Sequence, residues 1–202
     1  DAVRFTKGVN VTGVVTATSF TGNGASLTSL PAANLTGTLP AISGANLTGI
    51  SAGITMANSW NCSSGFNYSS TTTITSWSED TTGKIGTGMS NSSGIFTFPS
   101  TGIYRVRFSQ STYNIGAAEN RYVGAFVNWS TNSGGSYSIL REQYNHINND
   151  NACTTTVVTS NYLDVTDTST TRIKFSVAAE NNSTLNGGGY GTFVEFLRLG
   201  DT

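Results

Sequence analysis

The sequence predicts an all-β protein folded as an antiparallel sandwich, and three observations predict it. Short segments alternate apolar and polar residues, as in 172–177, where Ile173, Phe175 and Val177 alternate with polar side chains. Turn-forming residues (Gly, Pro, Asn and Ser) separate these segments at short intervals. No window sustains the 3.6-residue periodicity of an amphipathic helix. We therefore expect two packed sheets and no helix.

The predicted strands follow one another closely through the C-terminal three quarters of the chain. They cover about residues 54–56, 72–77, 94–98, 103–112, 121–130, 136–144, 153–165, 171–179 and 191–199. The segment 99–102 between two of them begins with Pro99, which cannot donate to a ladder, and ends with Gly102, which tolerates positive φ. We expect a tight connection between antiparallel strands there.

Composition excludes several classes of function. The chain has 202 residues, of which 37% are hydrophobic and only 10% charged, and its net charge is −1. This leaves no basic surface for nucleic acid and no polybasic patch for an anionic membrane. No apolar run is long enough to cross a bilayer, and Asp1 is no initiator, so we expect a mature piece or a fragment of a longer protein.

Residues 1–52 differ in kind from residues 53–202, and we expect a domain boundary between them. An apolar residue followed by Thr and then Gly or Ser recurs at Val11, Phe20, Leu27, Leu35 and Leu47. Such a unit cannot bury its single apolar side chain alone, and the irregular spacing disfavours a self-contained solenoid. We expect a narrow β stem to which three chains each contribute. A flexible Gly/Ser/Thr linker is the alternative.

Both parts resemble known families. The spacing of Gly94, Phe96, Pro99, Gly102, Tyr104 and Phe108, together with the strand 191–197, resembles the C1q/TNF-like trimeric jelly roll over about residues 53–202. Residues 9–50 resemble the shaft repeats of phage tail fibres and related virion spikes. The first resemblance implies a fold and a homotrimer without identifying a ligand, because its motif residues are structural.

The last strand also predicts assembly. Apolar side chains point both ways along 192–199, so both faces of this strand should be covered, one of them by another chain. The predicted trimer interface consists of Phe193, Glu195, Phe196, Leu197 and Leu199. Arg105 and Arg107 point away from the core face of their strand, and we expect them to pair with carboxylates such as Glu195 across chains.

Strand parity predicts where a receptor would bind. Counting strands back from the C-terminus places the loops 79–92, 113–120, 145–152 and 180–190 at the end of the sandwich far from the stem. These loops are rich in Asn, Gly and Tyr, a composition that suits recognition, although solvated turns would use the same residues. The predicted receptor-binding residues are Tyr113, Asn114, Tyr144, Asn145, His146, Asn148, Asn149, Asp150, Asn186 and Tyr190.

We expect no enzyme, no cofactor and no metal site. The chain has one histidine and no Gly-x-Ser-x-Gly elbow, which leaves little from which to build a nucleophile and base. Asp164 and Asp167 could offer two carboxylates to calcium, but a turn with local Asx hydrogen bonds explains them better. Cys62 and Cys153 could form a disulfide or remain free thiols, and the sequence leaves this open.

Together these features predict the C-terminal part of a homotrimeric viral fibre, as the stem resemblance implies. Its head would bind a host-surface receptor, namely a glycan or a protein, and its stem would join upstream fibre or virion proteins at the virion surface or outside the cell. The alternative is a virion decoration or surface-filament cap that trimerises and terminates the stem without binding a receptor. A secreted C1q-like regulator is disfavoured because no collagen Gly-x-y stalk is present.

Overall fold

The computed structural model describes residues 6–19, 21, 53–114, 120–148, 153–189 and 191–202. The chain divides into two units, Asp1–Thr48 and Gly49–Thr202. In the first unit, residues 6–19 and 21 form no strand and their side chains are exposed. The repeats at Phe20, Leu27, Leu35 and Leu47 lie outside the described residues, so the stem stays a prediction.

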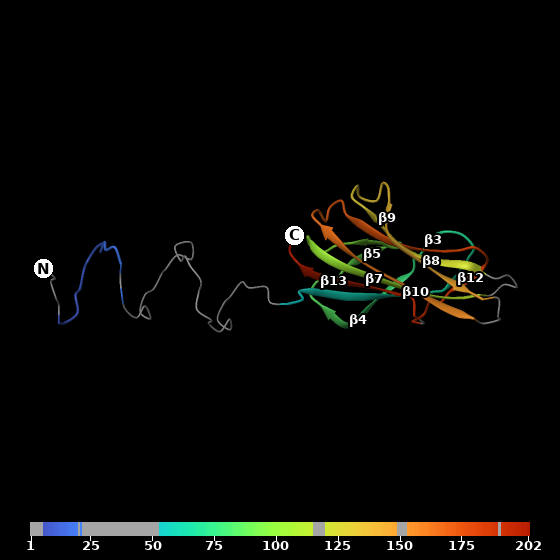
Figure 1. Ribbon diagram of the computed structural model, residues 1–202, viewed down its shortest axis with the longest axis horizontal. Helices are drawn as coiled ribbons and strands as arrows, with labels where there is room; N and C mark the ends of the chain where they lie inside the picture. The colour runs from blue at the N-terminus through green and yellow to red at the C-terminus, as the bar shows by residue number, and fades with distance from the viewer. Residues whose placement is uncertain (1–5, 20, 22–52, 115–119, 149–152, 190) are drawn as a thin grey trace. The chain divides into compact units, whose positions relative to one another are not determined.

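The second unit is a sandwich of two antiparallel sheets (Figure 1). The first sheet has the order β2-β12-β7-β13-β1-β4, and β10 pairs with the free side of β7. Its strands are β1 (Met56–Cys62), β2 (Phe66–Tyr68), β4 (Trp77–Ile85), β7 (Gly102–Asn114), β10 (Thr154–Val165), β12 (Ser183–Leu185) and β13 (Phe193–Gly200).

The second sheet has the order β5-β6-β11-β8-β9, with β3 paired to β11. Its strands are β3 (Thr72–Thr73), β5 (Ser90–Ser92), β6 (Ile95–Thr97), β8 (Asn120–Ser130), β9 (Ser138–Ile147) and β11 (Arg172–Ala179). The described residues form no helix. The prediction of an all-β antiparallel sandwich is therefore confirmed.

Aromatic side chains from both sheets meet between them and form the centre of the core. The ring centroids of Phe96 and Phe196 lie 5.2 Å apart, and those of Phe108 and Phe175 lie 5.1 Å apart. All four side chains are at most 1% exposed. These side chains all point into the core because every second residue of a strand points to the same face of its sheet. Aromatic pairs at these separations stabilise a core beyond the apolar area that they bury.

The turn at 99–102 forms as predicted but joins different partners. Its first strand, β6, belongs to the second sheet and the following strand, β7, belongs to the first, so the turn crosses between layers. The Tyr104 hydroxyl donates to the Ser100 carbonyl at 2.9 Å, and Gly102 has φ of +141°. The prediction of positive φ at Gly102 is confirmed, whereas the two strands are not ladder partners.

The prediction that residues 79–92 form a loop at the far end is wrong. Residues 77–85 form β4, which runs along β1 and places Ile85 opposite Ala57 at the other end of the sheet. Lys84 and Glu79 form an ion pair of 2.7 Å along this strand. The segment is poor in residues with high strand propensity, but pairing with a neighbouring strand overrides weak local preference at a sheet edge.

Candidate functional site

The outward face of the first sheet exposes apolar side chains. On β7, Tyr104, Val106 and Phe108 are fully buried, so the residues between them point outward. We call the outward residues of β1, β7, β10 and β13 the assembly face. Apolar members stand well exposed: Ile103 (39%), Val158 (43%) and Tyr162 (65%), with Leu199 (47%) at the end of β13. These exposed apolar side chains share the face with Arg105 and Arg107.

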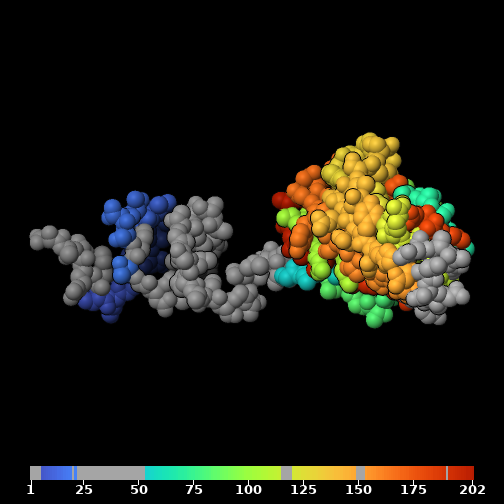
Figure 2. Space-filling view, turned by 45° about the vertical axis from the view of Figure 1, so that its right-hand side comes forward, coloured from blue at the N-terminus to red at the C-terminus, as the bar shows by residue number. Residues whose placement is uncertain are grey.

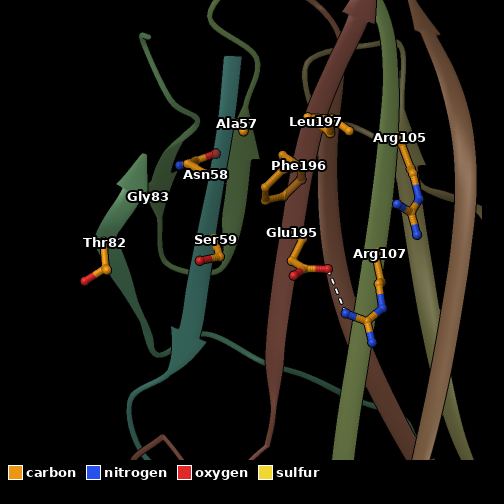
Figure 3. A pocket seen from close by; sticks show the side chains of 10 residues that line it. All are labelled: Ala57, Asn58, Ser59, Thr82, Gly83, Arg105, Arg107, Glu195, Phe196 and Leu197. Carbon is orange, nitrogen blue, oxygen red and sulfur yellow. Dashed lines mark hydrogen bonds and ion pairs between the residues drawn. The ribbon is translucent and has the colours of Figure 1, made fainter. Parts of the chain in front are cut away.

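A shallow groove crosses the assembly face from β4 to β7 (Figure 3). Its volume is about 270 Å³, and its lining mixes apolar and charged groups from strands that are neighbours in the sheet. The lining residues that matter here are Ala57, Ser59, Arg105, Arg107, Glu195 and Leu197. The groove can therefore accept a segment that carries both an apolar contact and a carboxylate.

The two arginines of the groove have different partners. Arg107 donates to the Glu195 carboxylate at 2.8 Å, and its guanidinium lies 5.1 Å from the centroid of the Phe193 ring. Arg107 thus pairs with the predicted carboxylate, but within its own chain, because the β7–β13 register places the two residues opposite each other. Arg105 donates only to the Ser160 hydroxyl, at 3.4 Å, and has no carboxylate partner among the described residues.

The predicted interface residues divide between two faces of β13. Phe193, Glu195 and Leu197 are partly exposed on the outward face. Phe196 is 1% exposed and packs against Phe96 and Phe175, so its assignment to the interface is wrong. Alternation explains this, because residue 196 points opposite to 195 and 197. Leu199 lies where the register with β7 shifts, between Arg198 and Gly200.

The described ends of three predicted far loops do meet at one end of the sandwich. The Asn114 backbone N–H donates to the Cys153 carbonyl at 3.2 Å, and the Asn114 side chain donates to the Asn148 carbonyl at 3.3 Å. Asn120 pairs with Ile147 in the β8–β9 ladder, and its side-chain carbonyl oxygen accepts from the Asn181 backbone N–H. We call this region the distal end. Its gathering follows from the antiparallel strand order.

Several amides that were predicted to contact a receptor form hydrogen bonds within the chain at the distal end. Asn114 is 3% exposed. The Asn145 side chain donates to the Thr155 hydroxyl at 2.8 Å, and its carbonyl oxygen accepts from the His146 backbone N–H. The Asn186 side chain donates to the Ser111 hydroxyl at 2.9 Å. Tyr113 is the penultimate residue of β7, before Asn114, while Asn149, Asp150 and Tyr190 lie outside the described residues.

Tyr144 does not belong to a loop. It lies in β9 opposite Gly124 of β8, and its ring packs against Tyr122 and Phe126 on the outward face of the second sheet. We call these three rings the aromatic platform. The sequence analysis missed it, although a signal was present: Tyr122 and Phe126 alternate with the core residues Val123, Ala125 and Val127, so they had to point outward.

Carboxylates flank the platform. The Tyr144 hydroxyl donates to Glu142 at 3.2 Å, and Glu180 forms an ion pair with Arg121 beside Tyr122. Partial burial, with the nearby Glu142 charge, raises the pKa of Tyr144, so its hydroxyl stays protonated and continues to donate. The hydrogen bond from Arg121 lowers the pKa of Glu180, so that this carboxylate stays ionised.

Other predicted features are simpler. Asp167 accepts from the backbone N–H and hydroxyl of Ser169 and from the hydroxyl of Thr170, which confirms the predicted Asx turn. Cys62 and Cys153 both have free thiols and form no disulfide.

Within the described ranges, no group of three or more His, Cys, Asp or Glu residues could hold a metal ion. The described part of the chain also contains no helix that is long and apolar enough to cross a membrane.

The strand order and the two-layer core define this unit as a TNF-like jelly-roll sandwich. Murine APRIL, crystallised at pH 5.0, superposes with a TM-score of 0.56 at 15% identity, over 71% of this chain and 98% of that chain. Eiger TNF from S. frugiperda superposes with a TM-score of 0.57 at 12% identity, over 74% and 95% of the two chains. No family model and no curated protein matches the sequence. At these identities the likeness establishes the fold alone.

Proposed function

We propose that residues 53–202 form the head of a homotrimer and that the assembly face is the surface through which its three chains pack. The observation that carries this proposal is the exposure of Ile103, Val158 and Tyr162 on one sheet face. Covering such a face with copies of the same chain removes apolar surface from water, at about 25 cal/mol per Å². A threefold arrangement also fits the TNF-like fold, in which the sequence resemblance implies a trimer.

The trimer is proposed to be the C-terminal part of a viral fibre, in which residues 1–52 form the stem and join upstream fibre or virion proteins. The repeat of apolar residue, Thr and Gly or Ser supports this origin. The head would bind a receptor on the host surface, with a glycan as the favoured class. Three identical heads on one stem convert weak single contacts into strong attachment, because the second and third contacts form within one complex.

The internal hydrogen bonds of the distal end favour a second candidate, a cap that terminates and registers the stem without binding a receptor. Asn114, Asn145 and Asn186 all use their side-chain amides on neighbouring parts of the same chain. Amides committed in this way stabilise the sandwich and have less capacity left for a ligand. In this candidate, deleting residues 53–202 would prevent trimerisation of the stem, while the intact protein would attach to no cell.

One experiment separates the two candidates. Light scattering first establishes the mass of the full chain in solution, and fluorescent protein is then applied to a broad panel of bacterial and algal cells. Trimer that labels a narrow set of strains supports a receptor-binding head. Trimer that labels no cell supports the cap, and a monomer contradicts both candidates, since each needs the assembly face to be covered.

A further inference from the structure

The aromatic platform lies on the layer of the sandwich opposite to the assembly face. It belongs to β8 and β9 of the second sheet, whereas the assembly face belongs to the first sheet. Figure 2 shows the gold segment of β9 on the surface of this unit. Because the two faces point away from each other, covering the first sheet in a trimer leaves the platform open to a ligand.

An open depression of about 530 Å³ lies over the platform. Ala178 lines this depression, and Gly124 lies opposite Ala178 in the β8–β11 ladder. A Cβ atom at position 124 would lie 2.8 Å from Cε1 of Tyr144 and 2.9 Å from Cε2 of Phe126. Because Gly124 has no Cβ atom, the Tyr144 ring can pack directly against the backbone of β8.

The rings are held in one arrangement. The Tyr144 ring is nearly perpendicular to that of Tyr122 (86°, centroids 5.8 Å apart) and to that of Phe126 (87°, 5.6 Å). Edge-to-face contacts of this kind are favourable and fix the ring positions. Tyr122 and Tyr144 remain 39% and 44% exposed. The platform thus offers a preorganised apolar surface, which lowers the entropy that a ligand loses on binding.

The polar groups around the platform select the charge of the ligand. Glu142 accepts one hydrogen bond, from Tyr144, and has no cationic partner among the described residues. Glu180 is neutralised by its ion pair with Arg121. One uncompensated carboxylate remains, which accepts hydrogen bonds from hydroxyl groups and repels anions.

We propose that the aromatic platform binds a neutral saccharide ring. The C–H face of the ring would stack on Tyr144, the perpendicular Tyr122 ring would contact the edge of the sugar, and a ring hydroxyl would donate to Glu142. A sugar combines an apolar face with a rim of hydroxyl donors, which is the chemistry that this depression complements. The biological role of this sugar site rests on the receptor-binding function proposed above. The proposal places sugar recognition on the side of the head instead of at its distal end.

The test uses the full chain on a glycan array that carries neutral hexose and N-acetylhexosamine oligosaccharides beside their sialylated counterparts. We expect binding to neutral glycans and weaker binding to the sialylated ones. Tyr144→Ala removes the stacking ring, and Gly124→Ala displaces it without removing any aromatic group. Each should weaken binding at least about tenfold, as loss of a central contact does. Ile95 is an exposed apolar residue (37%) on β6 of the same sheet, and β11 separates it from the platform strands, so Ile95→Ala is the matched control and should bind like the wild type.

The outcomes for the platform and for the proposed function are distinguishable. Folded wild-type protein that binds no array glycan overturns the saccharide proposal, as do folded Tyr144→Ala and Gly124→Ala variants that bind like the wild type. If the wild type then still labels cells, and Tyr144→Ala labels them equally, the receptor-binding head stands without the platform. Neutral-glycan binding that depends on Tyr144, without labelling of any cell, supports the platform and contradicts host attachment.

Discussion

Arg107 forms a 2.8 Å hydrogen-bonded ion pair with Glu195 on the neighbouring strand of the same chain, while Arg105, two residues earlier, reaches only the hydroxyl of Ser160. The pair neutralises two charges that would otherwise oppose burial of the assembly face. Arg105 is left as a cation in the same groove, available to a carboxylate of a second copy. Electrostatic complementarity at this point would fix the register of assembly more than it would add affinity.

Arg105→Glu should therefore weaken trimerisation. An unpaired carboxylate that is desolvated in an interface costs several kcal/mol, so the variant should sediment and scatter light as a smaller species. Arg141→Glu makes the same charge change on the exposed strand β9 and should leave the trimer intact. Equal masses for the two variants would contradict the assignment of the assembly face.

Phe196 and Leu199 should respond differently to truncation. Phe196→Ala leaves a cavity among Phe96, Phe175 and their neighbours and should lower the free energy of unfolding by about 3–5 kcal/mol, as measured in urea. Leu199 is 47% exposed, so Leu199→Ala should leave the folded chain intact and weaken association as seen by light scattering. If Leu199→Ala destabilised the fold as strongly as Phe196→Ala, β13 would not have one core face and one outward face.

Glu79 should make stability depend on pH. Its carboxylate accepts from Lys84 at 2.7 Å and from the Asn58 amide at 3.0 Å, and the Lys84 hydrogen bond is the main reason that the pKa of Glu79 lies below its ordinary value of 4.5. A lowered pKa in the folded state stabilises the protein above pH 4.5. That contribution disappears as the pH falls through the folded-state pKa.

Glu79→Gln should consequently be less stable than the wild type at pH 7, and the difference in the midpoint of urea unfolding should shrink as the pH falls below 4.5. Midpoints measured at several pH values between neutral and acid check this. A difference that stayed constant across the range would show that Glu79 acts through packing and not through its charge.

Gly102→Ala should strongly destabilise the turn between the layers. Residue 102 has φ of +141°, and an added Cβ would lie 2.5 Å from the Gly200 carbonyl oxygen. A strained backbone of this kind costs about 1–3 kcal/mol, and the contact with a backbone atom adds to it. Gly200→Ala, where a Cβ meets no atom within 4 Å, is the matched control, and calorimetry of both variants checks the difference.

Much of the fold could be predicted because alternation fixes which residues are buried. Ile173, Phe175 and Val177 are all fully buried, as the pattern of 172–177 predicted. Loops were harder. Residues 79–92 lack apolar alternation, and only pairing with β1 makes their first half a strand. The aromatic platform was hidden for a related reason, because Tyr122 and Tyr144 lie 22 positions apart and meet only when β8 pairs with β9.

By itself, the sequence determined the fold class, the faces of strands with clear alternation such as 172–177, and the distal gathering of the described loop ends, because these follow from local periodicity and from the parity of antiparallel strands. The tertiary structure decided which residues meet. In the tertiary structure Phe196 lies in the core, Arg107 pairs with Glu195 within one chain, and the Tyr144 ring lies over Gly124. Strand register decides such contacts between residues distant in the chain, and a shift of one residue would have turned each side chain to the opposite face.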